Sequence, residues 1–181
     1  MKRCVILAAA PVEDYSIITS ALFPDDYIIC ADGGALHAQK LGRTPDLAVG
    51  DFDSCRPEDI NAEKKIFPRE KDDTDFMLAA YEGLARGYRD FLAFGATGGS
   101  RTDHTFGAYA AAAYLAENGA SVELRDEKCT IYALCGANWS FPNRRGIYQY
   151  SHGAAAQRES LPPVQNIISQ ISPCGPIIRW A

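Results

Sequence analysis

The sequence predicts an α/β fold: a mostly parallel sheet with helices on both faces, followed by a short β-hairpin and an irregular or degenerate β tail. Three observations support this. Through residue 135, short β-rich apolar runs alternate with helical stretches, as in chains that build a parallel sheet. Two further apolar runs are separated only by a polar turn, which indicates a hairpin. Beyond residue 135, neither a strand period of two nor a helical period of 3.6 is sustained.

The expected elements follow in order along the chain. The strands are Arg3 to Ala9, Tyr27 to Ala31, Leu47 to Gly50, Lys65 to Phe67 and Asp90 to Phe94. Each expected helix ends near a Gly or Pro, which does not easily continue a helix. The helices are Glu13 to Leu22, Gly34 to Leu41, Thr74 to Arg86 and Thr102 to Glu117. The last helix is apolar nearly all round and is expected to be buried. The hairpin joins Ser121 to Arg125 with Cys129 to Leu134 through the turn Asp126-Glu127-Lys128.

The first apolar run, Cys4 to Ala10, allows two interpretations because Met1-Lys2-Arg3 precedes it. It resembles a short secretory signal, but its length is at the lower limit and favours a buried first strand. No run approaches the 18 apolar residues of a membrane span. The six cysteines form no C-x-x-C pair, so a structural zinc site is not expected. We therefore expect a cytoplasmic protein without a membrane partner.

Composition limits the number of cores and the class of partner. With 181 residues and 47% apolar composition, the chain can bury one sizeable core. A net charge of −5 argues against nucleic-acid binding, which requires concentrated positive charge. After residue 135 the chain has one acidic and four basic residues, and five of the ten prolines. We expect an α/β domain over residues 1–120 and a remnant of a small β domain over residues 121–181, atypical after residue 135.

Acidic or glycine-rich segments follow four of the expected strands. In an open parallel sheet, ligands bind beyond the carboxyl ends of the strands, so these segments are expected to meet at one rim. They contain Asp32-Gly33-Gly34, the pair Asp51 and Asp53, the pair Asp72 and Asp75, and the run Gly95 to His104.

The spacing of Asp51 and Asp53 suits a cation. On extended backbone both carboxylates point to the same side while Phe52 points into the protein. With Asp75 and Asp32 nearby, the hard oxygen ligands favour Mg²⁺ over Ca²⁺, for which there is no EF-hand spacing. The alternative for each acid is structural: Asp73 or Thr74 caps the following helix, and single Asp residues form turns.

The run Thr97-Gly98-Gly99-Ser100-Arg101 provides unpaired backbone N–H groups at a helix start, which is how proteins cradle phosphate. It lacks the order of a P-loop or a dinucleotide fingerprint. Its alternative interpretation is a tight strand-to-helix turn. His104 also has a structural interpretation, as a histidine in the first turn of the helix that is not a catalytic base.

Taken in order, these four runs resemble the thiamine pyrophosphokinase family. They stand here as Ala31 to Leu36, Gly50 to Ser54, Asp72 to Asp75, and Gly95 to His104. Leu36 replaces the usual Asn of the family, and Ser100 is inserted before Arg101.

The resemblance implies transfer of the diphosphoryl group of ATP to thiamine, giving thiamine diphosphate and AMP, in a homodimer with the active site at the subunit interface. It implies a Mg²⁺ cofactor, and a related hydroxylated acceptor is an alternative to thiamine. The implied metal ligands are Asp51, Asp53, Asp75 and Asp72. The implied catalytic residues are Asp51, Asp53, Asp75 and Asp103. The implied ATP- and phosphate-binding set is Asp32, Gly33, Gly34, Thr97, Gly98, Gly99, Ser100, Arg101 and, as a neighbour, His104.

The tail departs from the family, whose C-terminal β-sandwich helps to form the thiamine pocket and has a Ser-Asn pair near its end. This sequence contains no such pair. Three explanations remain open: a divergent pocket, a truncated replacement that leaves an inactive nucleotide-binding domain, or a shift of reading frame. The abrupt loss of Asp and Lys after residue 135 favours the last, which the downstream nucleotide sequence would test.

Overall fold

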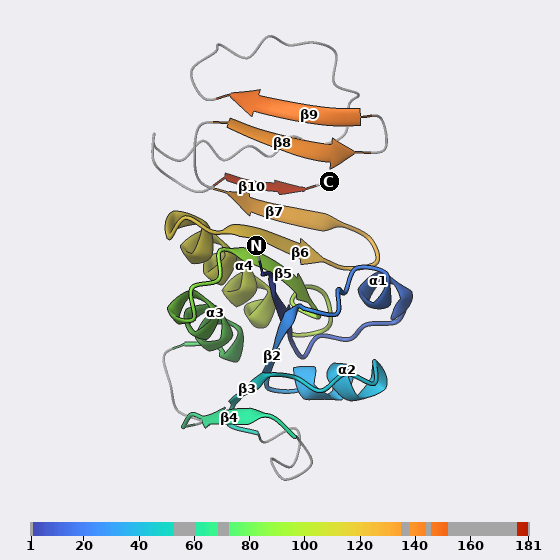
Figure 1. The fold of residues 1–181 in the computed structure, drawn as a ribbon, viewed down its shortest axis with the longest axis vertical. Helices are drawn as coiled ribbons and strands as arrows, with labels where there is room; N and C mark the ends of the chain where they lie inside the picture. The colour runs from blue at the N-terminus through green and yellow to red at the C-terminus, as the bar shows by residue number, and fades with distance from the viewer. Residues whose placement is uncertain are drawn as a thin grey trace.

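An eight-stranded sheet runs through the part of the chain that the computed structural model describes, in the order β10-β7-β6-β5-β1-β2-β3-β4 (Figure 1). That part comprises residues 2–52, 61–68 and 73–134, together with the backbone of three later strands. The strands of this sheet are β1 (Cys4–Leu7), β2 (Tyr27–Ala31), β3 (Leu47–Gly50), β4 (Glu63–Ile66), β5 (Asp90–Phe94), β6 (Ser121–Arg125), β7 (Thr130–Leu134) and β10 (Ile177–Trp180). The pairings from β4 across to β6 are all parallel, which confirms the expected mostly parallel sheet.

Helices cover both faces of this sheet, also as expected (Figure 1). They are α1 (Ser16–Thr19), α2 (Gly34–Lys40), α3 (Asp75–Ala85) and α4 (Thr102–Glu117). Side chains alternate along β1, so Cys4 and Ile6 join the core under α3 and α4, and Val5 and Leu7 join the core under α1 and α2. The sheet is therefore the middle layer of three.

Several predicted bounds agree with the structure to the residue, among them those of β2, β3, β5, β6 and α4. The first helix differs most, because α1 spans four residues where the sequence predicts Glu13 to Leu22. The backbone N–H groups of Glu13 and Asp14 donate to the carboxylate of Glu127 at 2.8 and 3.2 Å. This contact with a distant turn holds residues 13 and 14 outside the helix.

Helix α4, expected to be buried because it is apolar nearly all round, is buried along one face only. Its buried residues form one stripe, which consists of Ala108, Ala111, Ala112, Leu115 and Ala116. Phe106 is 67% exposed, although it is apolar. The stripe of small side chains lets α4 lie close to the sheet, and its opposite face has no described neighbour.

The chain beyond α4 begins with the expected hairpin. Strand β7 pairs antiparallel with β6, and the N–H of Asp126 donates to the carbonyl of Cys129 at 3.0 Å. Strand β6 pairs with β5, so the main sheet continues past residue 120, and the division into two domains there stays a prediction. In the tail, β8 (Asn138–Asn143) and β9 (Gly146–Ser151) form a separate antiparallel pair, and β10 pairs with β7.

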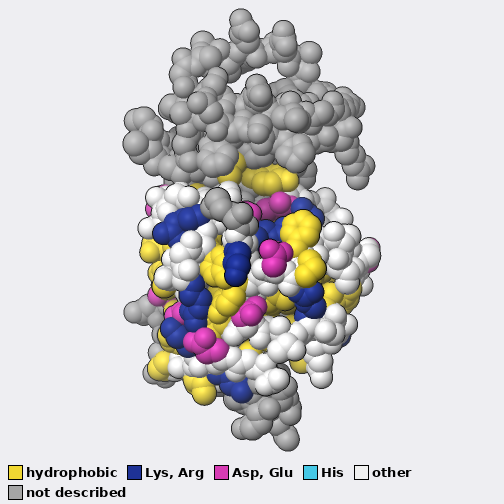
Figure 2. Space-filling model, viewed as in Figure 1, with side chains coloured by type: hydrophobic (Ala, Val, Ile, Leu, Met, Phe, Trp, Pro, Cys, Tyr) yellow, Lys and Arg dark blue, Asp and Glu magenta, His cyan; other side chains and the backbone are white. Residues whose placement is uncertain are grey.

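No helix in the described ranges is both long enough and apolar enough to cross a membrane. On the face seen in Figure 2, basic and acidic side chains are interspersed and do not gather by sign.

Candidate functional site

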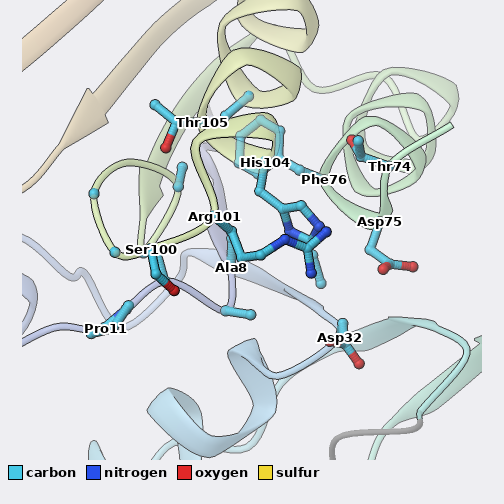
Figure 3. A pocket seen from close by; sticks show the side chains of 18 residues that line it. Ala8, Pro11, Asp32, Thr74, Asp75, Phe76, Ser100, Arg101, His104 and Thr105 are labelled. Atoms are coloured by element: carbon cyan, nitrogen blue, oxygen red, sulfur yellow. The ribbon is translucent and has the colours of Figure 1, made fainter.

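The strand order creates a crevice at the carboxyl ends of β1 and β5. From β1 the chain moves outward through β2, β3 and β4, and it then returns to place β5 on the other side of β1. Such a switch point is where open α/β sheets bind ligands. A cavity of about 310 Å³ lies there, large enough for part of a nucleotide-sized ligand (Figure 3). Its lining is Ala8–Pro11, Ala31, Asp32, Thr74–Phe76, Gly95, Ala96, Gly98–Arg101, His104, Thr105 and Ala108.

Asp32 lines this cavity directly after β2 (Figure 3). Its φ of 45° is in the left-handed region, which is uncommon for a residue other than glycine. Strand β3 holds it there: the Asp32 N–H donates to the Val49 carbonyl at 2.8 Å. A Cβ at Gly50 would come within 3.2 Å of the Asp32 Cα. Backbone strain of this kind persists at functional sites when the surroundings enforce it.

Asp75 lines the same cavity from the first turn of α3. The neighbouring Thr74 caps this helix, since its Oγ1 accepts the N–H of Met77 at 3.2 Å. The structural alternative is therefore confirmed for Thr74, while Asp75 is not the cap. A carboxylate in a first helical turn is favoured by the helix dipole.

Of the remaining predicted metal ligands, only Asp51 lies within the described residues, and it is not part of the cavity lining. Asp51 follows β3, and Asp53 and Asp72 are outside the described residues. Phe52 is buried as expected, but its φ is 56°, so the expectation of extended backbone between Asp51 and Asp53 is wrong at this residue. A non-extended residue no longer places the flanking carboxylates on one side by simple alternation.

The donor set in the cavity fits Mg²⁺. Within the described residues, no group of three or more His, Cys, Asp or Glu side chains is arranged to hold a metal ion. Magnesium sites commonly use only one or two carboxylates, with waters and substrate phosphates as the other ligands. Asp32 and Asp75 supply two carboxylates beside a backbone segment suited to phosphate, so the residues present are compatible with such a site.

The glycine-rich segment after β5 forms the other side of the cavity wall. Gly98 and Gly99 have φ values of 82° and 72°, which glycine adopts without steric cost. A Cβ at Gly95 would come within 2.4 Å of the Ala8 carbonyl oxygen. These conformations bring the backbone of Gly98, Gly99 and Ser100 to the cavity at the start of α4. Backbone N–H groups at a helix start bind anions.

Three predicted phosphate-binding residues do not line the cavity. Gly33 and Gly34 begin α2, and a Cβ at Gly34 would come within 1.9 Å of the Leu7 carbonyl oxygen. The glycine at position 34 is thus explained by close packing of α2 on β1. Thr97 is buried, and its hydroxyl donates to Asp126 Oδ2 at 2.7 Å.

Arg101 and His104 do line the cavity, from the N-terminus and first turn of α4 (Figure 3). Arg101 Nη2 donates to Asp103 Oδ2 at 2.7 Å, and both side chains are about two-thirds exposed, at 64% and 65%. The hydrogen bond from Arg101 lowers the pKa of Asp103 to about 2. Asp103 lies outside the cavity lining and reaches the site through Arg101 and through His104, whose Nε2 is 3.9 Å from Asp103 Oδ2.

The loop after β1, Ala8–Pro11, was missed as part of the site. Its backbone joins the other loop: the Ala8 N–H donates to the Phe94 carbonyl at 2.9 Å, and the Ala10 N–H to the Gly95 carbonyl at 2.8 Å. Its position directly after a strand could have indicated that it belongs to the site, because ligands bind beyond the carboxyl ends of parallel strands. Its neutral residues carried no chemical pattern, and only the strand order shows that β1 lies beside β5.

The comparisons with known proteins agree with this geometry. The family described as "Thiamin pyrophosphokinase, catalytic domain" matches residues 19–124. A search of curated proteins found no match. Thiamine pyrophosphokinase from Bacillus subtilis has a similar structure, with a TM-score of 0.64 and 24% identity, over 77% of this chain and 68% of that one.

Two further solved structures are similar. The probable thiamine pyrophosphokinase from Staphylococcus saprophyticus subsp. saprophyticus has 27% identity and a TM-score of 0.59, over 78% of this chain and 73% of that one. Thiamin pyrophosphokinase from Candida albicans has 18% identity and a TM-score of 0.61, over 78% of this chain and 64% of that one. This chain therefore spans about two thirds of their length. Because the family match covers more than half of its residues, the chain belongs to the thiamin pyrophosphokinase family.

Proposed function

We propose that this protein transfers the diphosphoryl group of ATP to the hydroxyl group of thiamine, giving thiamine diphosphate and AMP. The observation that carries the proposal is the cavity at the carboxyl ends of β1 and β5. There, Asp32 and Asp75 share one lining with the glycine-rich start of α4 and with Arg101. Family membership supports thiamine as the acceptor. The proposal includes a cytoplasmic homodimer, on the strength of the family resemblance.

Each part of the lining has a role suited to phosphoryl-type transfer. Backbone N–H groups of Gly98 to Ser100 would bind phosphate oxygens, and the Arg101 guanidinium would add a planar fork of donors. A guanidinium has five N–H donors, so the pair with Asp103 leaves some for a ligand. Asp103 would orient Arg101. Together these groups would hold the phosphate chain in one orientation, which lowers the barrier by positioning the reactants.

Asp32 and Asp75 would hold Mg²⁺ in this cavity, with Asp51, Asp53 and Asp72 as further carboxylates along the same strand ends. When bound, the ion neutralises charge on phosphate oxygens during transfer. Without it, two carboxylates in one cavity would repel the phosphates of ATP.

A product assay tests the proposal directly. The chain is incubated with ATP, Mg²⁺ and thiamine, and the nucleotides and thiamine esters are separated by chromatography. AMP and thiamine diphosphate in equal amounts are expected. ADP as the main product would overturn diphosphoryl transfer. Tight ATP binding without AMP would show instead a nucleotide-binding domain that does not turn over, and AMP formed only with other alcohols would show a different acceptor.

A double variant tests the carboxylates. Asp32→Ala with Asp75→Ala should reduce Mg²⁺-dependent turnover at least 100-fold, because the charge of bound phosphates is no longer neutralised. Glu117→Ala is the matched control, since it removes an exposed acid at the far end of α4. Turnover in the folded double variant equal to that of the control would exclude these two residues as metal ligands.

A further inference from the structure

The turn of the β6–β7 hairpin contacts both loops that line the cavity. Its two acidic residues, Asp126 and Glu127, lie just beyond residue 124, where the family match ends. Neither lines the cavity. Their carboxylates instead accept hydrogen bonds from the two loops that line the cavity, at residues beside the lining residues.

Asp126 binds the loop after β5. Its Oδ1 accepts the N–H groups of Lys128 and Cys129 at 2.7 and 2.8 Å, which folds the turn itself. Its Oδ2 accepts the hydroxyl of Thr97 at 2.7 Å. Thr97 immediately precedes Gly98 in the glycine-rich segment, and only 6% of its surface is exposed. The carboxylate therefore fixes the point where this segment leaves β5.

Glu127 binds the loop after β1. Its Oε1 accepts the N–H groups of Glu13 and Asp14, just beyond the lining residues Ala8–Pro11. At their near ends the two loops are already joined by the bond from the Ala10 N–H to the Gly95 carbonyl. The hairpin turn adds a second connection, through Thr97 in the loop after β5 and through Glu13 and Asp14 after β1.

Both carboxylates are held in the charged form. Burial raises the pKa of Asp126, but the hydrogen bonds from Thr97 and from the amides of Lys128 and Cys129 outweigh it, so the pKa is lowered. Burial also opposes ionisation of Glu127, and hydrogen bonds from backbone amides, including those of Glu13 and Asp14, lower its pKa. Hydrogen bonds to a charged acceptor are about twice as strong as neutral ones.

We propose that Asp126 and Glu127 are positioning residues, which set the two cavity loops in the arrangement that binds the phosphates of the ligand. The identity of that ligand rests on the proposed function; the positioning does not. In this arrangement Asp126 acts through Thr97 to place Gly98 to Arg101, and Thr97 does not itself touch phosphate.

The test compares a substitution that removes the Thr97 hydroxyl with one that keeps it. Thr97→Val removes the donor to Asp126 at nearly constant volume, and Thr97→Ser keeps it. Glu127→Ala releases the other loop. Glu123→Ala is the control on the same hairpin, because it breaks the pair with Arg125 and leaves both contacts of the turn in place. Hydrogen exchange of residues 8–14 and 95–101 is measured without ligand, and the Kd of Mg·ATP is measured by calorimetry.

Thr97→Val should speed exchange in residues 95–101 and weaken Mg·ATP binding roughly tenfold, the value of one hydrogen bond to a charged group. The KM for ATP should rise by a similar factor with kcat changed less, since the loop binds phosphate before and during transfer. The Kd of Mg·ATP for Thr97→Ser should lie within about threefold of the wild-type value. Glu127→Ala should speed exchange in residues 8–14.

Equal Kd values for Thr97→Val, Thr97→Ser and Glu123→Ala would overturn the proposal, as would faster exchange with unchanged affinity. If the wild-type chain forms no AMP, the proposed function is lost. The exchange rates and the Kd then still decide whether the hairpin turn positions the loops.

Discussion

Two Arg–Asp pairs in the described part of the chain lie at opposite ends of the parallel strands, and they differ chiefly in their exposure. At the amino edge, Arg3 Nη2 lies 2.6 Å from Asp26 Oδ2, and their side chains are 18% and 2% exposed. At the carboxyl edge, Arg101 Nη2 lies 2.7 Å from Asp103 Oδ2, with 64% and 65% exposed. The same two residue types thus form contacts of the same length in different surroundings.

The surroundings decide what each pair can do. Around the first pair every partner is protein: Asp26 Oδ2 accepts the Phe23 N–H, Arg3 Nη2 donates to the Ala21 carbonyl, and the guanidinium lies 4.6 Å from the centre of the Phe23 ring. Removing one of these two charges leaves the other largely buried without its partner. The second pair is in water, where an ion pair contributes little to stability and its donors can exchange partners. The first pair holds the fold, and the second is available to a ligand.

Asp26→Ala gives the largest expected effect on stability. It leaves the Arg3 charge largely buried without its partner, which should cost about 3–5 kcal/mol of unfolding free energy. Urea denaturation followed by circular dichroism measures this. Asp103→Ala is the matched variant at the exposed pair and should leave the denaturation midpoint unchanged. Equal losses in the two variants would remove the distinction between the pairs.

Arg101→Ala should show the opposite profile. We expect kcat/KM for ATP to fall roughly 10- to 100-fold, because hydrogen bonds to phosphate are lost, with no change in the denaturation midpoint. Arg101→Lys keeps the charge without the planar fork and should recover only part of the activity. An Arg101→Ala protein that is destabilised yet fully active would show that this pair, too, is structural.

Thr74→Ala examines a residue that belongs to both kinds of region, since it caps α3 and also lines the cavity. Loss of the cap should cost about 1 kcal/mol of unfolding free energy. Thr74→Ser keeps the hydroxyl and should restore stability. A thermal denaturation series of the three proteins measures the difference, and indistinguishable Thr74→Ala and wild-type curves would contradict the cap.

His37 gives the smallest expected effect, a change of slope with pH. It is buried, its Nε2 donates to the Ala10 carbonyl at 3.0 Å, and its Nδ1 accepts the Tyr15 hydroxyl at 2.6 Å. Burial lowers its pKa, opposed by the bond to Ala10 and assisted by the charge of Lys40. The folded protein therefore binds this proton less readily than the unfolded chain, whose histidine pKa is about 6.5.

Stability from neutral His37 is accordingly present above about pH 6.5 and is lost as pH falls through that value toward the lower pKa of the folded state. His37→Gln, which keeps a donor but does not titrate, should flatten the Tm profile between about pH 5 and 7. His104→Gln, at an exposed histidine, is the control. Parallel Tm profiles of wild type and His37→Gln would contradict the assignment.

Much of the fold was predictable because its signals are local. The runs Tyr27 to Ala31 and Asp90 to Phe94 are strands with the predicted bounds, since apolar runs of that length bounded by polar residues suit buried parallel strands. The segments after β2 and β5, and Asp75 after β4, also meet at one cavity as expected. The metal-binding, phosphate-binding and catalytic roles predicted for the site residues all remain predictions.

The errors arose where a distant segment altered a local pattern. The expected first helix is shortened where Glu127 binds the amides of Glu13 and Asp14. Phe106 is apolar but exposed, because burial depends on whether a neighbouring element covers that face of α4.

The sequence by itself determined which segments are strands and helices and which strand ends are acidic or glycine-rich, because those properties depend on residues close together in the chain. Only the tertiary structure decided that β1 lies beside β5, that the neutral loop Ala8–Pro11 therefore lines the cavity, and that a hairpin turn holds both its loops. It also decided that one Arg–Asp pair is buried and the other exposed. Strand order and burial result from contacts between residues far apart in sequence, and no local pattern encodes them.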